Sequence, residues 1–342
     1  MNLDSIRSLY DNKNISVEIE AGITLKIKDE VFRPGTIIVH LPAPINASWL
    51  KEGQLVDSEP MFRMMSVEDY PQRSAFFYEI LTDNIPFSIS YAFSSVHDLV
   101  CPDLSLIDDT AQKCFTKEEI ARFSAAGHCG CESYTALPFD RVTIKDASEE
   151  KGLKFKEKYR TFLFNNGIDT GQPESLDLRG TLVKKIYNLV TDSFITNDET
   201  LNIAFVSMCR MCGIPARWQG GWAVDGSAVS HDWAMVHLLP YGWVYIDCDF
   251  ARKSGNNKRP GTDTYLKDFF FGNIDPCMVP TASAPASDLY PAKDYPRADE
   301  IFNTRGEVEL IPGKMDVNEH VDGFGLKADE FETEISIRGT VL

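Results

Sequence analysis

One histidine and one aspartate flank a predicted β-hairpin in positions that suit catalysis. Two runs with strand-like alternation, 231–238 and 243–247, are separated by the turn signal Pro-Tyr-Gly at 240–242. If the pairing is centred near residue 240, His231 and Asp247 are diagonal neighbours on one face, with backbones about 7–8 Å apart. The aspartate can then orient the imidazole and stabilise its cation, as in a nucleophile–base–acid triad. By spacing alone, such a pair is more often an ordinary surface contact.

The element directly before this hairpin is predicted to be a helix that ends at Gly213 and Pro215. Its apolar stripe comprises Leu201, Ala204, Phe205, Met208, Cys209 and Cys212. Two earlier stripes, at 155–163 and 182–190, predict two more helices. Because helices are followed here by antiparallel strands, the fold class of this part is α+β.

The first 105 residues carry the period-two pattern of short strands instead. These runs lie at 17–27, 36–41, 75–80 and 87–93, with turn signals between them. They predict an antiparallel β-sandwich. His40 and His97 are isolated within it, so both are predicted to be structural.

Three segments follow from this pattern: a β-sandwich domain at 1–105, a connector at 106–145, and an α+β domain at 146–342. Residues 251–264 are polar and Gly-rich and are expected to form a loop. The segment from about 280 is rich in Pro and Asp and is expected to run over the surface as a tail.

The charge balance argues against some classes of partner. The formal net charge is −17 over 342 residues, which disfavours nucleic acid and anionic membranes as partners. The chain carries no leader-like N-terminal segment and no apolar run long enough to span a bilayer, so a cytoplasmic location is expected. The eight cysteines form no compact framework and are expected to be free thiols. No cofactor is predicted.

Two longer motifs resemble a known family. The run 209–222 reads CRMCGIPARWQGGW, and it resembles the C-R-x-x-G-I-P-A-R-W-Q-x-G-W stretch of bacterial transglutaminase-like proteins. The triplet HDW at 231–233 and the block PYGWVYID at 240–247 resemble the next motifs of that family. Shorter similarities at 70–73, 270–276 and 305–309 extend the resemblance over most of the chain.

The resemblance implies a papain-like fold in which a Cys at a helix N-terminus attacks an amide carbon. Exposed N–H groups and the helix dipole favour the thiolate there. His231 is then the base and Asp247 the orienting acid. The residues implied to line the cleft or pack beneath it are Trp218, Gln219, Trp222 and Trp233.

The nucleophile of this pattern is missing. The family places it fifteen residues before the Gly of GIPAR, and that position holds Asp198. Asn197 or Asp198 can cap the helix, so the helix is expected without its thiol. A carboxylate at 198 needs no base to deprotonate it, although it can act as a nucleophile or join His231 and Asp247 in acid–base work.

Other cysteines are alternatives. The connector contains Gly-His-Cys-Gly-Cys at 127–131, so Cys129 and Cys131 are alternative nucleophiles, about seventy residues before the family position. The same cysteines with His128 and Cys114 offer metal ligands, but their single C-x-C spacing is unlike usual zinc sites, and no metal is predicted. The remaining candidates are predicted to be buried or badly placed thiols: Cys209, Cys212, Cys248 and Cys277.

Three functions remain open. The first is a pseudoenzyme that keeps a cleft for a peptide, amide-containing or glycan ligand, without thiol catalysis. The second is an active amidase, peptidase or acyl transferase that uses Cys129, Cys131 or Asp198. The third is an interaction protein that binds through its β domain. Loss of a triad nucleophile costs orders of magnitude in rate, which favours the first.

Overall fold

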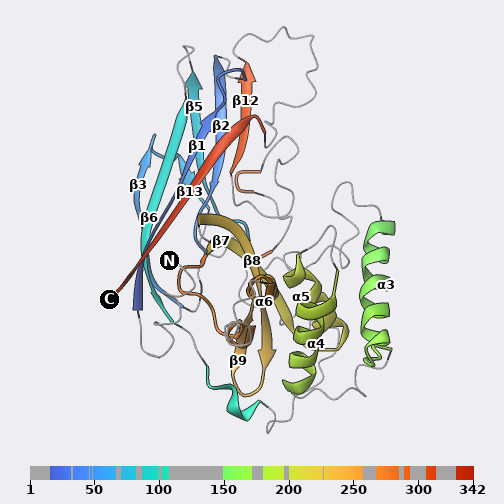
Figure 1. The fold of residues 1–342 in the computed structure, drawn as a ribbon. Coiled ribbons are helices and arrows are strands. Elements are labelled where there is room, and N and C mark those ends of the chain that lie inside the picture. Colours follow the sequence, from blue (N-terminus) through green and yellow to red (C-terminus); the bar gives the residue numbers. More distant parts are fainter. Residues whose placement is uncertain are drawn as a thin grey trace. The chain divides into compact units, whose positions relative to one another are not determined.

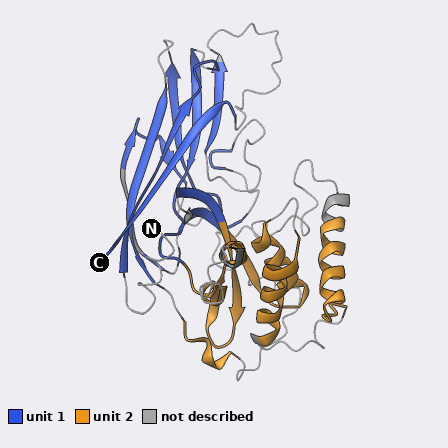
Figure 2. Ribbon diagram, viewed as in Figure 1, with its two compact units in different colours: residues 1–99, 220–231, 275–342 blue, residues 100–219, 232–274 orange. Residues whose placement is uncertain are grey.

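The computed structural model describes residues 16–31, 34–45, 47, 49–66, 71–81, 87–99, 102–107, 149–171, 180–195, 200–225, 227–256, 267–284, 289–292, 306–312 and 329–342. The chain divides into two compact units (Figure 2). The first comprises residues 1–99, 220–231 and 275–342, and the second comprises 100–219 and 232–274. Strands β7 (Ala216–Asp225) and β8 (Ser227–Leu238) contribute residues to both units.

The first unit contains two four-stranded antiparallel sheets (Figure 1). One has the order β13-β1-β6-β3 and the other the order β12-β2-β5-β4. Their strands are β1 (Ser16–Ile27), β2 (Gly35–Pro42), β3 (Leu50–Glu59), β4 (Met64–Met65), β5 (Ser74–Leu81), β6 (Ser88–Asp98), β12 (Glu307–Pro312) and β13 (Phe331–Val341).

Alternation along the strands explains the sandwich. On β1 the odd-numbered apolar residues from Val17 to Ile27 are all buried, and Glu18, Glu20 and Lys26 are exposed. Each buried Val, Ile or Leu side chain contributes about 1.5–3 kcal/mol of transfer free energy. The predicted β-sandwich is confirmed, including the strands at 17–27, 36–41, 75–80 and 87–93.

The C-terminal segment takes a larger part in this unit than its composition predicts. Strand β12 pairs with β2, and β13 pairs with β1 along eleven residues, from Val17↔Val341 to Ile27↔Phe331. These strands are therefore part of the two sheets and do not form the expected surface tail of an α+β domain. The reason lies in residues 331–341, whose alternating apolar and polar side chains fit one face of a sheet.

Helices dominate the second unit. They are α3 (Glu149–Asn165), α4 (Gly180–Ser193), α5 (Leu201–Met211) and α6 (Cys248–Asn256), with a 3₁₀ turn η1 (Leu104–Leu106). The apolar face of α4 packs on α5, where Tyr187 meets Phe205 edge-to-face at 6.5 Å between ring centroids. No helix in the described part of the chain combines the length and apolar character needed to cross a bilayer.

Helix α5 is buried along nearly its whole length and from every side. Residues 201–209 are all buried, so this helix runs through the core of its unit. It ends at Met211, and Gly213 follows the C-cap with a φ of 74° that favours glycine, which agrees with the predicted stop. Its start differs from the prediction, because Thr200 is the N-cap and accepts a hydrogen bond from the Ile203 amide. The candidate caps Asn197 and Asp198 therefore precede the cap.

The third sheet has the order β10-β9-β8-β7-β11, with β9 (Gly242–Ile246), β10 (Phe271–Gly272) and β11 (Val279–Ala282). Leu238 pairs with Gly242 and Ala234 with Ile246, which confirms a hairpin centred on residue 240. Helix α6 occupies 248–256, part of which the sequence predicts as a loop. Arg252 stabilises this helix by donating to the carbonyls of three residues at the end of α4, namely Val190, Thr191 and Phe194.

His97 on β6 confers a testable pH dependence on the stability of the first unit. Its Nδ1 donates to the Pro276 carbonyl at 2.8 Å, and its Nε2 accepts from the Ser95 hydroxyl at 2.7 Å. Burial lowers the pKa of His97 to about 4, against an ordinary value of 6.5. The folded chain therefore keeps this ring neutral at pH values where the unfolded chain protonates it.

We expect this histidine to cost the fold about 2–3 kcal/mol when the pH falls from 7 to 4.5. Stability is lost as the pH drops below 6.5, because only the unfolded state gains the proton. The measurement is urea unfolding of the parent and of His97→Gln at both pH values. The neutral glutamine should remove this part of the pH dependence, and equal acid sensitivity of the two proteins would contradict the assignment.

Candidate functional site

The start of α5 is built from polar side chains. The Thr200 hydroxyl donates to Oδ2 of Asp232 at 2.5 Å while its oxygen caps the helix. The indole N–H of Trp218 donates to the same carboxylate oxygen at 2.7 Å. Asp232 thus joins α5, β7 and β8. It is buried, with only 2% of the residue exposed.

Asn202, in the first turn of α5, links the helix to the β8–β9 hairpin and to α6. Its Nδ2 donates to the Asp232 carbonyl at 2.8 Å and to Oδ2 of Asp249 at 3.1 Å. Its Oδ1 accepts from the amide of Cys248 at 2.8 Å. Because Asn202 is fully buried, these bonds replace water for both ends of its amide.

Asp247 holds a fixed carboxylate at the start of α6. Its Oδ1 accepts from the Phe250 amide at 2.9 Å, and its carbonyl accepts from the Ala251 amide. Asn202 Nδ2 lies 3.4 Å from the same Oδ1, a longer contact. The backbone amide of Asp247 donates to the Phe270 carbonyl at 3.0 Å. The Asp247 carboxylate is therefore held by the Phe250 amide and Asn202, and its backbone is held by Phe270 and Ala251.

His231 lies on β8 and is 6% exposed. His231 is the last residue of the segment 220–231, which belongs to the first unit, whereas Asp247 belongs to the second unit. The pairing of β8 with β9 runs from Ala234↔Ile246 to Leu238↔Gly242 and includes neither His231 nor Asp247. Their approach to one another remains a prediction.

The tryptophans and the glutamine of the family-like motifs are buried. Trp218, Trp222 and Trp233 are at most 2% exposed, and Gln219 is 4% exposed. Trp233 donates its indole N–H to Oε1 of Gln219 at 2.8 Å, and Trp222 stacks on Phe93. Of the two roles implied for these residues, this burial favours packing beneath a cleft.

The four cysteines in the described part of the chain are all buried and reduced. Burial raises the pKa of Cys212 to about 12 and places the pKa of Cys209 well above its usual value. The pKa values of Cys248 and Cys277 are also raised, by burial first and by neighbouring aspartates second. These thiols therefore stay protonated near neutral pH and make poor nucleophiles.

Several residues predicted from sequence fall outside the described part of the chain. They are Asp198 at the family's cysteine position, the alternative nucleophiles Cys129 and Cys131, and the metal candidates His128 and Cys114. Their roles remain predictions.

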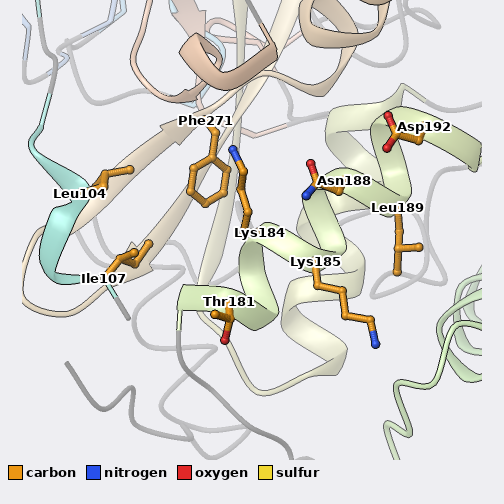
Figure 3. A pocket seen from close by; sticks show the side chains of 9 residues that line it. All are labelled: Leu104, Ile107, Thr181, Lys184, Lys185, Asn188, Leu189, Asp192 and Phe271. Atoms are coloured by element: carbon orange, nitrogen blue, oxygen red, sulfur yellow. The ribbon is translucent and has the colours of Figure 1, made fainter. Parts of the chain in front are cut away.

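A cavity of about 650 Å³ lies elsewhere in the second unit. It is bounded by η1, β10 and one face of α4 (Figure 3). Lys184 reaches over the ring of Phe271, with 4.3 Å between Nζ and the ring centroid, and also pairs with Asp268 at 3.0 Å. The cavity lining shares no residue with the polar cluster at the start of α5.

Thr200, Asn202, Asp232, Asp247 and Asp249 form a cluster of polar side chains at the start of α5. Its groups can orient an imidazole or hydrogen-bond a polar ligand. Of these residues, sequence reasoning identified only Asp247. A usable signal existed for Asn202, because a polar residue in a helix that is apolar on all sides must be bonded to something.

One family model and one solved structure are similar to this chain. Residues 173–248 match the model of the Transglutaminase-like superfamily. A crystal structure of a proposed cysteine protease from Cytophaga hutchinsonii is similar over 95% of this chain and 98% of that one, with 12% identity and a TM-score of 0.45. A search of curated proteins finds no match.

Proposed function

We propose that this protein uses its transglutaminase-like region, residues 173–248, to bind a peptide or other amide-containing ligand without thiol catalysis. The observation that carries the proposal is the state of the four described thiols. Cys209 and Cys212 lie at the far end of the very helix that begins at the polar cluster, and both are buried with raised pKa values. A protonated, buried thiol cannot serve as an attacking thiolate.

In this proposal Asp198 occupies the nucleophile's position, and His231 and Asp247 are kept as polar groups that bind and orient the ligand. One feature supports a binding role and another argues against a substitute nucleophile. The Asp247 carboxylate is held by the Phe250 amide, so it is ordered before a ligand arrives. Thr200 uses its hydroxyl for the cap and for Asp232, so this hydroxyl is committed to structure and does not replace the missing thiol.

The alternative is an active amidase, peptidase or acyl transferase of the same fold. It would use Cys129 or Cys131 as nucleophile, or Asp198 in acid–base work. Retention of both His231 and the well-anchored Asp247 favours it. The two functions differ in what happens to a thiol and in what happens to a bound peptide.

Thiol labelling separates them. With a maleimide at pH 7.5 and readout by peptide mass spectrometry, we expect Cys209, Cys212, Cys248 and Cys277 to react at least about 100-fold more slowly in the folded than in the urea-unfolded chain. We also expect no cysteine to react faster in the folded chain than in the unfolded chain. A fast Cys129 or Cys131 that becomes slow in His231→Ala would instead establish the enzyme.

The fate of bound peptides provides the second arm of this experiment. The protein is incubated with a pool of synthetic peptides and then separated from the unbound peptides. The masses of the retained peptides are measured by mass spectrometry. We expect retained peptides of unchanged mass. Shortened, deamidated or cross-linked peptides would refute the non-catalytic proposal, and retention of none would refute peptide binding.

A further inference from the structure

Strand β13 forms one edge of its sheet among the described strands. Its neighbour on one side is β1, and the strand order places it at the end of the sheet (Figure 1). At eleven residues, it is long for an edge strand and has no proline. A strand of this kind presents a row of backbone N–H and C=O groups to any second strand. We propose that β13 pairs antiparallel with β13 of a second copy of this chain.

The side chains of β13 are self-complementary about its midpoint, Ser336. An antiparallel pair centred there uses the whole strand, from residue 331 opposite 341 onward. It also sets Glu334 of each copy opposite Arg338 of the other. Both side chains are exposed and on the same face of the strand. Two opposite-charge cross-strand pairs therefore form around the two-fold axis.

The apolar side chains on the other face of β13 also fit a pairing centred on Ser336. Ile335 and Ile337 are half-buried at this edge. In the pair centred on Ser336, Ile335 of one copy lies opposite Ile337 of the other. Their remaining exposed surface would be covered by an equivalent isoleucine, so the apolar face continues from one copy to the next.

The pairing inside each chain leaves Glu334 available for this role. On β1, Arg338 stands opposite Glu20 and Glu332 stands opposite Lys26, so both have a residue of opposite charge across the strand pair. Glu334 stands opposite Thr24. The second copy would thus provide the opposite charge that β1 does not place across from Glu334. Natural edges are often protected by charged side chains, whereas Glu334 and Arg338 on this edge are spaced so that two copies attract each other.

Such a dimer is closed, because an isologous pairing of β13 with itself uses up the edge. It buries one strand pair, which is small for a protein interface, so we expect a weak dimer that forms with rising concentration. Sedimentation velocity between about 1 and 200 µM, a range suited to weak interfaces, should show a mass rising from 38.4 kDa toward twice that value.

Charge reversal tests the register. Glu334→Arg and Arg338→Glu should each weaken dimerisation by roughly tenfold or more, since each replaces two attractive pairs by two repulsive ones. An equimolar mixture of the two variants should recover dimers. In a mixed pair, positions 334 and 338 both carry arginine in one copy and both carry glutamate in the other, so each cross-strand pair again joins opposite charges.

The matched control is Glu332→Gln. It removes an equally exposed charge that faces Thr340 in this register, and it should change the affinity less than about twofold. Folding is checked by the melting temperature of every variant, so that a monomeric variant is compared only when it melts like the parent.

A parent that keeps the mass of one chain up to about 200 µM would overturn the proposal, which requires a dissociation constant below about that concentration. So would dimers that both charge reversals leave intact, or a Glu332→Gln variant as weak as Glu334→Arg. Failure of the mixed variants to associate would overturn the register centred on Ser336.

Discussion

Replacing Asp198 by cysteine should create a thiol that stays reactive at pH 6. Residue 198 precedes the N-cap of α5 by two positions, and if its side chain reaches the helix N-terminus, the exposed N–H groups, the helix dipole and the imidazolium of His231 all favour its thiolate. An ordinary thiol of pKa about 8.5 loses nearly 100-fold in labelling rate between pH 8 and pH 6, whereas the new thiol should lose less than about threefold. The measurement is the pH profile of maleimide labelling at this one residue, resolved by mass spectrometry.

Two variants control this result. Asn197→Cys places a thiol on the neighbouring residue and should show the ordinary pH profile. Asp198→Cys combined with His231→Ala should also revert to that profile, because the histidine that stabilises the thiolate is gone. An Asp198→Cys thiol that behaves like the Asn197→Cys thiol would show that residue 198 is not at the nucleophile's position.

Replacing Asn202 by leucine should destabilise the protein by about 3–5 kcal/mol. The change keeps a side chain of similar size but removes the bonds to the Asp232 carbonyl, Asp249 and the Cys248 amide. Buried backbone groups then lose their partners, which costs more than a lost surface contact. Urea unfolding followed by tryptophan fluorescence measures the effect.

The matched control is Asn188→Leu on α4. Asn188 is only half-buried and lies at the cavity of Figure 3, so its replacement should change stability by less than about 0.5 kcal/mol. Asn202→Asp adds a diagnostic pH dependence, because a buried carboxylate beside Asp247 and Asp249 has a raised pKa. Its stability should fall as the pH rises from 4 to 7. Equal effects at positions 188 and 202 would contradict the bridging role.

The sequence predicts those elements in which one local signal dominates. The hairpin centred on residue 240 follows from two period-two runs and an unambiguous turn, and the structure has that register. Helix α5 follows from its apolar stripe and from Gly213. The sequence places its start too early because Asn197, Asp198 and Thr200 are all good caps, and local chemistry does not choose between them.

Elements that depend on distant partners are harder to predict. The strand at 331–341 alternates well, but the polar and Pro-rich composition before it favours a tail. It is a strand because β1, more than 300 residues earlier in the chain, gives it a partner. Helix α6 escapes prediction because its Lys-Ser-Gly-Asn end has the composition of a loop, whereas Asp247 caps its start and Arg252 anchors it to α4.

The residues of the candidate site also differ in whether a local sequence signal reveals them. Asp247 is found from sequence because hairpin spacing and motif both point to it. Asn202 and Asp232 are not, since their importance comes from buried bonds between α5, β8 and α6 that no single segment of sequence reveals.

The pairing of β1 with β13 has a consequence for synthesis on the ribosome. Translation delivers residues 16–27 about 300 residues before 331–341, so β1 cannot pair with β13 until the codons for residues 331–341 are read. The helices and the β8–β9 hairpin, which join neighbours close in sequence, can form meanwhile. A nascent chain that stalls before residue 331 would leave β1 with an uncovered side, and we expect such truncated products to require chaperones or to be degraded.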